Sequence, residues 1–363
     1  MRFKTIFYAA TTALVIAVAG SSTASADINL PTGNCGLAAT NNCLVFDDFN
    51  VYSLAVLNQQ AGFGPVSPGD PYDVSTNGNP LRDALVIGTG AGGTALVNTD
   101  VIPSGAVDGA YNTPSAAGGG VTNFQTSGST ASNDASTALI PGNTTGTWDI
   151  MVSDLVDYLD GGKLGFFFNL NQANSDQTYL SQGQDALGWM AVTLTDTTGS
   201  NGSVTFWLDG DACDGPVGDP SHCDPSQSYA QTNANNSILP ADPNHDEWAY
   251  IHGQVCMSPA GAIVGFGACA QGDQTNTTVN QNLGASNAAF ALYSDLLQQA
   301  LLSGDYDKMS VDFRMAALTN GYEQLLIFAA LNIPEPITVM MFGAGLLGLM
   351  GFASLRRRKL KLA

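Results

Sequence analysis

A run of 19 residues near the C-terminus, 337–355, contains no charged side chain. As a helix with a rise of about 1.5 Å per residue it would span roughly 28 Å, which matches the apolar core of a bilayer. Five cations follow within residues 356–361, and cations that flank a span stay on the cytoplasmic side. A buried core helix is the alternative, but almost nothing follows against which it could pack. We therefore expect a transmembrane helix that leaves the preceding chain outside the cytoplasm.

The N-terminus predicts a secretory signal peptide. Arg2 and Lys4 precede an apolar run at 6–19, and Ala24-Ser25-Ala26 provides the small residues that signal peptidase accepts. The apolar run is too short to span a membrane easily, which argues against a permanent anchor. We expect signal peptidase to cleave after Ala26. The chain then divides into a signal peptide, an exported domain and a C-terminal tail, at residues 1–26, 27–333 and 334–363.

Pro334-Glu335-Pro336 stands directly before the apolar run. A Pro-Glu-Pro triplet, an apolar span and a terminal arginine cluster, in that order, resemble the PEP-CTERM sorting signal of Gram-negative bacteria. The resemblance implies that exosortase, a membrane protease-transpeptidase, recognises Pro334, Glu335 and Pro336. The protein would be anchored transiently in the inner membrane and then released or transferred to the cell surface. The family is associated with exopolysaccharide and the biofilm matrix. A plain single-pass anchor with a chance triplet is the alternative.

The exported domain is strongly acidic. It contains 30 acidic residues and only four cations, which leaves a net charge of −26. Such a surface repels nucleic acid, which binds through Lys and Arg, and it also repels anionic membranes. It favours solubility, cation binding and loose association in a matrix. We therefore expect no nucleic-acid partner. The four cations are Arg82, Lys163, Lys308 and Arg314.

Six cysteines in an exported chain indicate disulfide bonds. They fall into three close pairs along the chain, so local bridges are favoured over long-range ones. A zinc site is disfavoured, because no C-x-x-C motif occurs and the histidines do not flank the cysteines in finger fashion. The predicted bridges are Cys35–Cys43, Cys213–Cys223 and Cys256–Cys269.

The sequence of the exported domain predicts many short strands and few helices. Residues 104–147 are rich in Gly, Ser and Thr, and we expect loops there with one or two weak strands. Helices are expected at 152–159, with Ser153 as N-cap, and at 286–302, where apolar residues fall on one side. This pattern favours a β-sandwich, of jelly-roll type, with one or two helices. Strands are expected at 44–46, 51–57, 84–87, 163–170, 187–195, 204–208, 248–257, 308–315 and 323–330.

Glycines follow the expected strand 84–87 in a G-x-G-x-x-G pattern, at Gly88, Gly90 and Gly93. This is the dinucleotide-binding fingerprint only if a helix begins there to hold the pyrophosphate. The next residues are β-branched and include a proline, so we interpret the glycines as a turn.

An acidic loop between residues 209 and 224 is the candidate metal site. Calcium takes about six to eight oxygen ligands, which clustered aspartates can supply. The loop resembles the D-x-D-x-D-G calcium pattern, but Cys213 occupies the fifth position and displaces the third acid. A solvated acidic loop without bound metal is the alternative. The candidate calcium ligands are Asp209, Asp211, Asp214, Asp219 and Asp224.

A second cluster, His245-Asp246-Glu247 with Asp242 and His252, could bind zinc or exchange protons. No nucleophile motif accompanies it, so a polar loop before a strand is favoured. The segment 148–172, WDIMVSDLVDYLDGGKLGFFFNLNQ, resembles uncharacterised PEP-CTERM proteins and implies no activity.

Four tryptophans, at positions 148, 189, 207 and 248, could stack on sugar rings if they are exposed. Trp207 is opposite in phase to its apolar neighbours on strand 204–208, so it is expected to face outward. Together these features predict a non-catalytic exported surface or matrix protein without a cofactor. A calcium-assisted carbohydrate-binding module and a secreted hydrolase are the alternatives.

Overall fold

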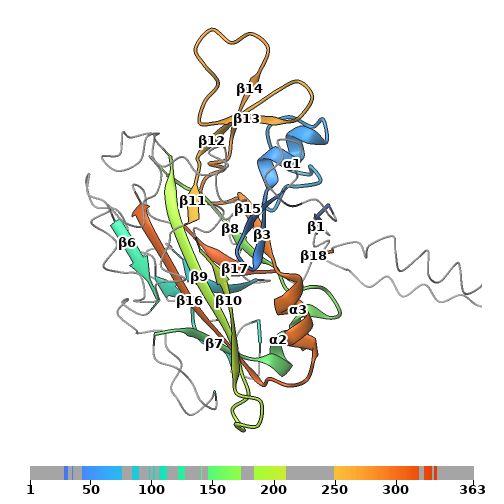
Figure 1. The fold of residues 1–363 in the computed structure, drawn as a ribbon, viewed down its shortest axis with the longest axis vertical. Helices are drawn as coiled ribbons and strands as arrows, with labels where there is room; N and C mark the ends of the chain where they lie inside the picture. Colours follow the sequence, from blue (N-terminus) through green and yellow to red (C-terminus); the bar gives the residue numbers. More distant parts are fainter. Residues whose placement is uncertain are drawn as a thin grey trace, which may run out of the picture.

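The computed structural model describes residues 28–31, 35, 43–75, 84–89, 98, 101–102, 106–112, 122–126, 140, 146–172, 184–209, 249–318, 323–328 and 331–332. Within these residues the protein is mainly β, with largely antiparallel sheets and three helices. Two large sheets form a body, and a small sheet projects from one end (Figure 1). In this part of the chain no helix is long and apolar enough to cross a membrane. The predicted signal peptide and the predicted span 337–355 lie outside it.

The seven-stranded sheet has the order β2-β3-β15-β8-β17-β4-β5, and all neighbours are antiparallel except β4 and β5. Its central strand β8 is a run of three phenylalanines, all buried. Phe166 and Phe168 face the core between the large sheets, whereas Phe167 packs into a second cluster with Leu54 and Leu57. A strand that is buried on both faces is typically apolar throughout. The strands are Leu44–Phe46, Phe49–Ser53, Phe290–Tyr293, Phe166–Phe168, Leu325–Ile327, Leu85–Thr89 and Tyr111–Asn112.

The six-stranded sheet is built on two long antiparallel strands, β9 and β16, which pair from Lys308 opposite Thr195 to Ala316 opposite Leu187. Alternate residues such as Met190 and Val311 point into the shared core, as a half-buried strand requires. The strands β10 and β11 pair with β9, and β6 and β7 pair with β16. The bounds in chain order are β6 Thr122–Gln125, β7 Trp148–Met151, β9 Ala186–Thr195, β10 Ser203–Leu208, β11 Ala249–Ile251 and β16 Lys308–Leu318.

Hydrogen bonds join the two large sheets at both sides. On one side the Asp48 N–H donates to the Trp207 carbonyl (3.1 Å), and the Trp207 N–H donates to the Asp48 carboxylate (2.9 Å). On the other side the Asp108 N–H donates to the Asp149 carbonyl (2.9 Å), and the chain then continues into β5 of the other sheet. The two sheets share one core. The β-sandwich of jelly-roll type stays a prediction.

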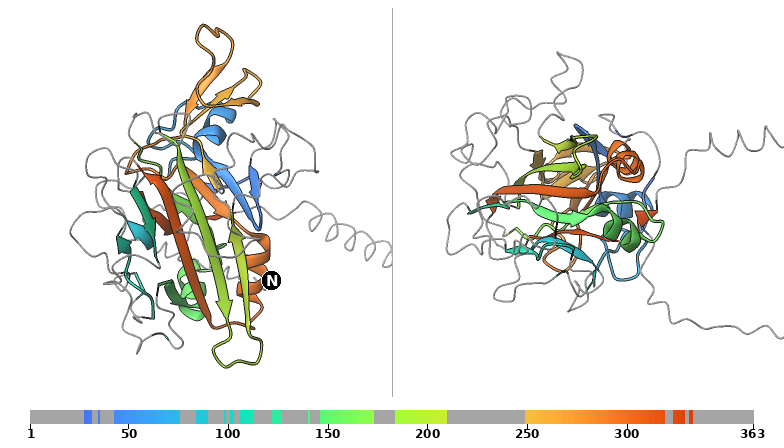
Figure 2. Two further views of the ribbon diagram at one scale, coloured as in Figure 1. Left: turned by 60° about the vertical axis from the view of Figure 1, so that its left-hand side comes forward. Right: turned by 90° about the horizontal axis from the view of Figure 1, so that it is seen from below.

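The third sheet contains β12 Gln254–Met257, β13 Ile263–Phe266 and β14 Thr277–Asn280, in the order β13-β12-β14. We call residues 253–282 the small lobe. It projects beyond the body in two different views (Figures 1 and 2). Helix α1, Leu54–Gln60, covers one face of this sheet, where Val56 contacts Val255 and Val279. A parallel pair of short strands, β1 Ile28–Asn29 and β18 Leu331–Asn332, completes the described elements.

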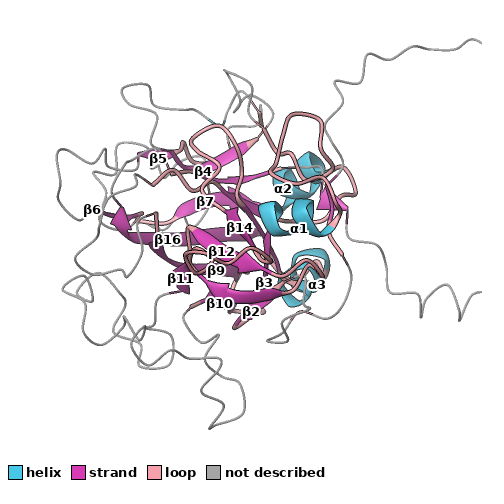
Figure 3. Cartoon of the chain, turned by 90° about the horizontal axis from the view of Figure 1, so that it is seen from above, coloured by secondary structure: helices cyan, strands magenta, loops and turns pink. Residues whose placement is uncertain are grey.

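The helices differ from the sequence prediction in two places. Residues 54–57, predicted as strand, begin α1, because the Ser53 hydroxyl caps the helix by accepting from the Val56 N–H (3.3 Å). The predicted helix 286–302 is wrong in its first half, where β15 lies between β3 and β8 with every residue buried. Only its second half forms α3, Asp295–Leu302, which is capped by Ser294. The three helices lie along one side of the sheets (Figure 3).

Helix α2, Val152–Leu159, has its predicted bounds, but Met151 is the N-cap and Ser153 lies inside the helix. The strands predicted at 187–195, 204–208 and 308–315 are confirmed as β9, β10 and β16. The strand predicted at 248–257 is interrupted at His252 and Gly253, where the chain passes from the body into the small lobe. Gly88 lies within β4, opposite Leu325, and does not begin a turn. Gly90 and Gly93 lie outside the described residues.

Candidate functional site

Most of the predicted calcium loop lies outside the described residues. Asp209 directly follows β10, and its side chain is buried with 1% exposure. Asp211, Asp214, Asp219 and Asp224 are not described, nor is the Cys213–Cys223 pair. The calcium site therefore stays a prediction.

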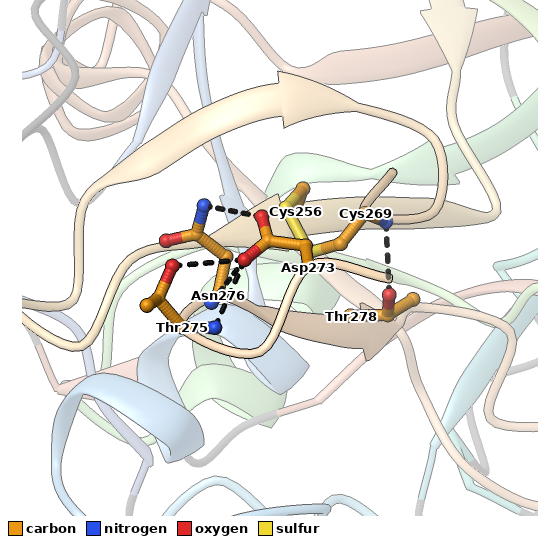
Figure 4. The surroundings of a disulfide bond; sticks show 6 residues. All are labelled: Cys256, Cys269, Asp273, Thr275, Asn276 and Thr278. Carbon is orange, nitrogen blue, oxygen red and sulfur yellow. Dashed lines mark hydrogen bonds between the residues drawn. A yellow bond between two sulfur atoms is a disulfide. The ribbon is translucent and has the colours of Figure 1, made fainter. Parts of the chain in front are cut away.

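The other two predicted disulfides are present. Cys35 bonds to Cys43 and Cys256 bonds to Cys269, with Cα–Cα distances of 4.7 and 4.8 Å. The second bridge ties β12 to the loop that leads to β14 (Figure 4). Both pairings are the local ones that the spacing predicts.

Asp273 lies beside this second bridge, and the two sulfurs and one carboxylate oxygen fall within 4.8 Å of one another. Among the described residues this is the one grouping of three potential metal ligands. Its sulfurs are bonded to each other, so they are not thiolate ligands. The Asp273 carboxylate accepts from the N–H groups of Thr275 (2.9 Å) and Asn276 (3.1 Å), which lower its pKa to about 2 (Figure 4). The arrangement is a closed turn and not a metal site.

His252 is the one described member of the predicted histidine cluster; Asp242, His245, Asp246 and Glu247 lie outside the described residues. It occupies the junction between β11 and β12, and burial lowers its pKa to about 3. The imidazole is therefore neutral at physiological pH. Its carbonyl accepts from Gln281 Nε2 (2.8 Å), and the next N–H, of Gly253, donates to buried Asp185 (2.7 Å).

Glu323 is fully buried just before β17, and burial raises the pKa of its carboxyl group to about 8. Gln172 Nε2 donates to Glu323 Oε1 (2.9 Å), and the Gln172 carbonyl accepts from Asn282 Nδ2 (2.5 Å). Asn282 follows Gln281 in the chain, and Gln281 bonds to the His252 carbonyl, so this set of hydrogen bonds extends to His252. We call Asp185, His252, Gln281, Gln172 and Glu323 the junction cluster.

The junction cluster connects the body to the root of the small lobe. At neutral pH its glutamic acid is protonated and its histidine is neutral, so two of its three titratable groups carry no charge. Gln172, Gln281 and the Gly253 N–H are among its hydrogen-bonding groups. These contacts order the strand ends where the body meets the small lobe.

A second polar group lies on the face of β9 and β16 that points away from the core. The Arg314 guanidinium stacks over Trp189, with Cζ 4.8 Å from the ring centroid, and its Nε donates to both Asp312 oxygens (3.1 and 3.2 Å). Trp207 contacts Trp189 with ring centroids 5.7 Å apart. Trp189 is buried and Trp207 is half-buried. The predicted outward phase of Trp207 is thus confirmed.

A third group is a buried charge network between the two large sheets. Lys308 Nζ lies 3.5 Å from Asp149 Oδ2, with side-chain exposures of 3% and 0%. The Asp149 N–H donates to Asp108 Oδ2 (2.8 Å), and the Asp108 carbonyl accepts from Asn98 Nδ2 (2.6 Å). Asn98 also bonds both backbone groups of Val86 on β4. The network therefore ties the six-stranded sheet to the seven-stranded sheet.

Sequence analysis did not pair Arg314 or Lys308 with their partners, and it did not single out Glu323. The sequence contains one signal that points to buried pairing of Arg314 and Lys308. Only four cations occur in the exported domain, and both of these alternate with apolar residues on a central strand. A cation in such a position is retained only where it is paired.

Comparison with known families gives two matches. A domain of unknown function, DUF8239, matches residues 28–314, which include almost all of the described strands. This chain belongs to that family. The PEP-CTERM protein-sorting motif matches residues 332–359, so the chain carries a signal for exosortase processing and export through the envelope of Gram-negative bacteria. No curated protein and no solved structure matches the chain.

Proposed function

We propose that this DUF8239 protein is a non-catalytic component of the cell surface or extracellular matrix, associated with exopolysaccharide after exosortase has processed it. The observation that carries the proposal is the sorting motif at residues 332–359, directly after an acidic β-rich domain. In this proposal Pro334, Glu335 and Pro336 are recognised by exosortase, and the segment 337–355 anchors the precursor in the inner membrane. Signal peptidase removes residues 1–26.

The described chemistry supports a structural role. The titratable groups of the junction cluster bond to amides and backbone groups, and the buried lysine is paired with an aspartate. Catalytic carboxylates need access to a substrate, whereas Glu323 is fully buried. A mainly β body with one shared core fits a binding or matrix protein of this kind.

Replacing Pro334-Glu335-Pro336 by three alanines tests the sorting part of the proposal. The precursor should accumulate in the inner membrane, and intact-mass analysis of the secreted fraction should find little mature protein. A scrambled apolar span with the triplet intact serves as control for membrane insertion. Equal release of the mutant and the wild type would contradict recognition of the triplet.

A second candidate, carbohydrate binding, is favoured by the half-buried Trp207. Its ring lies on the outer face of the six-stranded sheet, where the hydroxyl oxygens of Thr193 and Thr205 are 2.9 Å apart. An aromatic ring with nearby hydroxyls can stack on a sugar and bond to it. Asp209 lies two residues after Trp207, so a calcium ion bound there could assist sugar binding. A glycan array with and without a chelator tests this, and Trp207→Ala should lose binding while Phe63→Ala, at an exposed aromatic residue, should not.

A further inference from the structure

The small lobe differs from the rest of the exported domain in charge. Asp273 is its only charged residue, and no other charge occurs between Gly253 and Ser294. Asp273 is itself held in a closed turn. The exported domain as a whole has a net charge of −26. Another acidic surface can therefore approach the lobe with little repulsion.

Both faces of the small-lobe sheet are occupied. Helix α1 covers the face that carries Val255, Met257 and Val279. The opposite face carries Cys256 and its disulfide to Cys269, whose N–H donates to Thr278 Oγ1 (2.9 Å). Its two edges are β13 and β14.

The two edges are protected to different degrees. Strand β13 contains a bulge, because Gly265 pairs with Cys256 while Ile263 pairs with Met257, and Val264 is left unpaired with 55% exposure. A bulge of this kind blunts an edge against further pairing. Strand β14 pairs with β12 along its whole length without a bulge.

The free side of β14 also lacks charge and proline. Residues 274–282 contain neither, and Thr277, Thr278 and Asn280 are exposed. Among the described residues no strand pairs with this side. Threonine and valine favour strands, and natural edges are usually guarded by lysine, proline or an irregularity. Of these guards β14 has none.

We propose that β14 pairs with β14 of a second copy of this protein, antiparallel and around a two-fold axis. The three-stranded small-lobe sheets of the two copies would then form one continuous sheet of six strands. A two-fold contact brings the same patch of both chains together, and an antiparallel edge pair satisfies this symmetry. The lobes project from one end of each molecule (Figure 2), so pairing through them keeps the acidic bodies apart.

The charge distribution favours a second copy of this protein, and not a basic protein, as the partner of the β14 edge. A cationic protein or peptide would be attracted to the acidic body and not to the nearly uncharged lobe. The contact is limited to a strand of four residues on each side, which is far smaller than a standard interface of about 1,600 Å². We therefore expect weak, reversible dimers that become important at the high local concentrations of a surface or matrix. This step deepens the proposed matrix function but does not depend on the ligand.

Sedimentation velocity of the purified exported domain over a wide concentration range tests the proposal. The wild type should show reversible dimers, and Thr277→Lys should weaken dimerisation at least tenfold because a lysine on an edge strand opposes pairing with another strand. Thr277 is exposed, so this variant should fold; circular dichroism and melting check that it does. Thr277→Val should strengthen the dimer, and Ser200→Lys, in the exposed turn after β9, should leave it unchanged.

A monomer at all concentrations, or equal weakening by Thr277→Lys and Ser200→Lys, would overturn edge pairing. General charge effects are separated by repeating the series at high salt, which screens repulsion between acidic bodies and should strengthen a dimer made through the lobe. The purified domain is used without the tail, so failure of this experiment leaves the sorting proposal intact. Failure of the triple-alanine experiment likewise leaves dimerisation intact.

Discussion

The body and the small lobe of this protein stabilise their strands in different ways. The body encloses a large core between two sheets and buries charged groups within it, including Lys308, Asp149 and Asp108. The lobe has a small core of five buried residues, almost no charge, and a disulfide. A large core can enclose a paired charge, whereas three short strands cannot bury enough apolar surface alone. The lobe therefore depends on α1 and on its covalent bridge.

The comparison predicts that the largest effect comes from breaking the buried ion pair in the body. Lys308→Met leaves the buried Asp149 carboxylate without its cation, and we expect the free energy of unfolding to fall by about 3–5 kcal/mol. Urea unfolding measures this. Lys163→Met is the control, because Lys163 lies 6.0 Å from the Tyr293 ring and is only half-buried; it should cost about 1 kcal/mol or less. Similar losses of unfolding free energy in both variants would contradict this prediction, because they would show that Asp149 does not depend on Lys308 for its compensating charge.

Removing the disulfide should affect the lobe and spare the body. Cys256 and Cys269 are 13 residues apart, and closing a loop of this size contributes about 3 kcal/mol. In Cys256→Ala/Cys269→Ala, hydrogen exchange should accelerate in residues 254–280 while the strands β9 and β16 keep their protection. Equal loss of protection in both regions would mean that lobe and body unfold as one unit.

Substitution of Gly253 tests how closely the junction between the body and the small lobe is packed. A Cβ atom at this position would lie 2.5 Å from Gln184 Cβ and 2.7 Å from the Gln184 carbonyl oxygen. Backbone must move to relieve this contact, so Gly253→Ala should cost about 1–3 kcal/mol. Gly265→Ala is the matched control within the lobe, because its Cβ would lie 4.0 Å from Cys256 Cβ. A harmless Gly253→Ala would show that the junction is not closely packed.

A pH dependence of stability should also originate in the junction cluster. Burial raises the pKa of Glu323 from 4.5 to about 8, so the folded state binds more protons than the unfolded chain in that range. Stability should therefore fall as pH rises through it, by up to about 1.4 kcal/mol per pH unit. His252 acts in the opposite direction, but only between about pH 3 and 6.5.

The interval from pH 6.5 to about 8 thus separates Glu323 from His252. Glu323→Gln should flatten the pH profile of urea unfolding there, whereas His252→Gln should change it only at lower pH. A profile that keeps its slope in Glu323→Gln would assign the titration to another group.

Local features were predictable from the sequence wherever neighbouring residues decide the outcome. Alternation identified β9, β10 and β16, and spacing identified the bridges Cys35–Cys43 and Cys256–Cys269. The sorting motif is likewise a continuous segment, and the family match at residues 332–359 agrees with it.

Structure that depends on distant partners was not predictable in this way. Residues 290–293 have helical periodicity with the residues after them, yet they form β15 because β3 and β8 bond to both edges. Residues 54–57 resemble a strand, but the Ser53 cap and the small-lobe sheet make them a helix. In both cases burial against elements far along the chain outweighed local propensity.

The sequence alone determined that this protein carries an exosortase sorting signal, that Cys35 pairs with Cys43 and Cys256 with Cys269, and that its exported domain is acidic and mainly β, because each depends on composition or on a short segment. Only the tertiary structure decided which charges are buried and paired. Asp149 and Lys308 are 159 residues apart, and Gln172 and Glu323 are 151 apart. The free energy of a buried charge depends on the groups that surround it in space, and no local pattern carries that information.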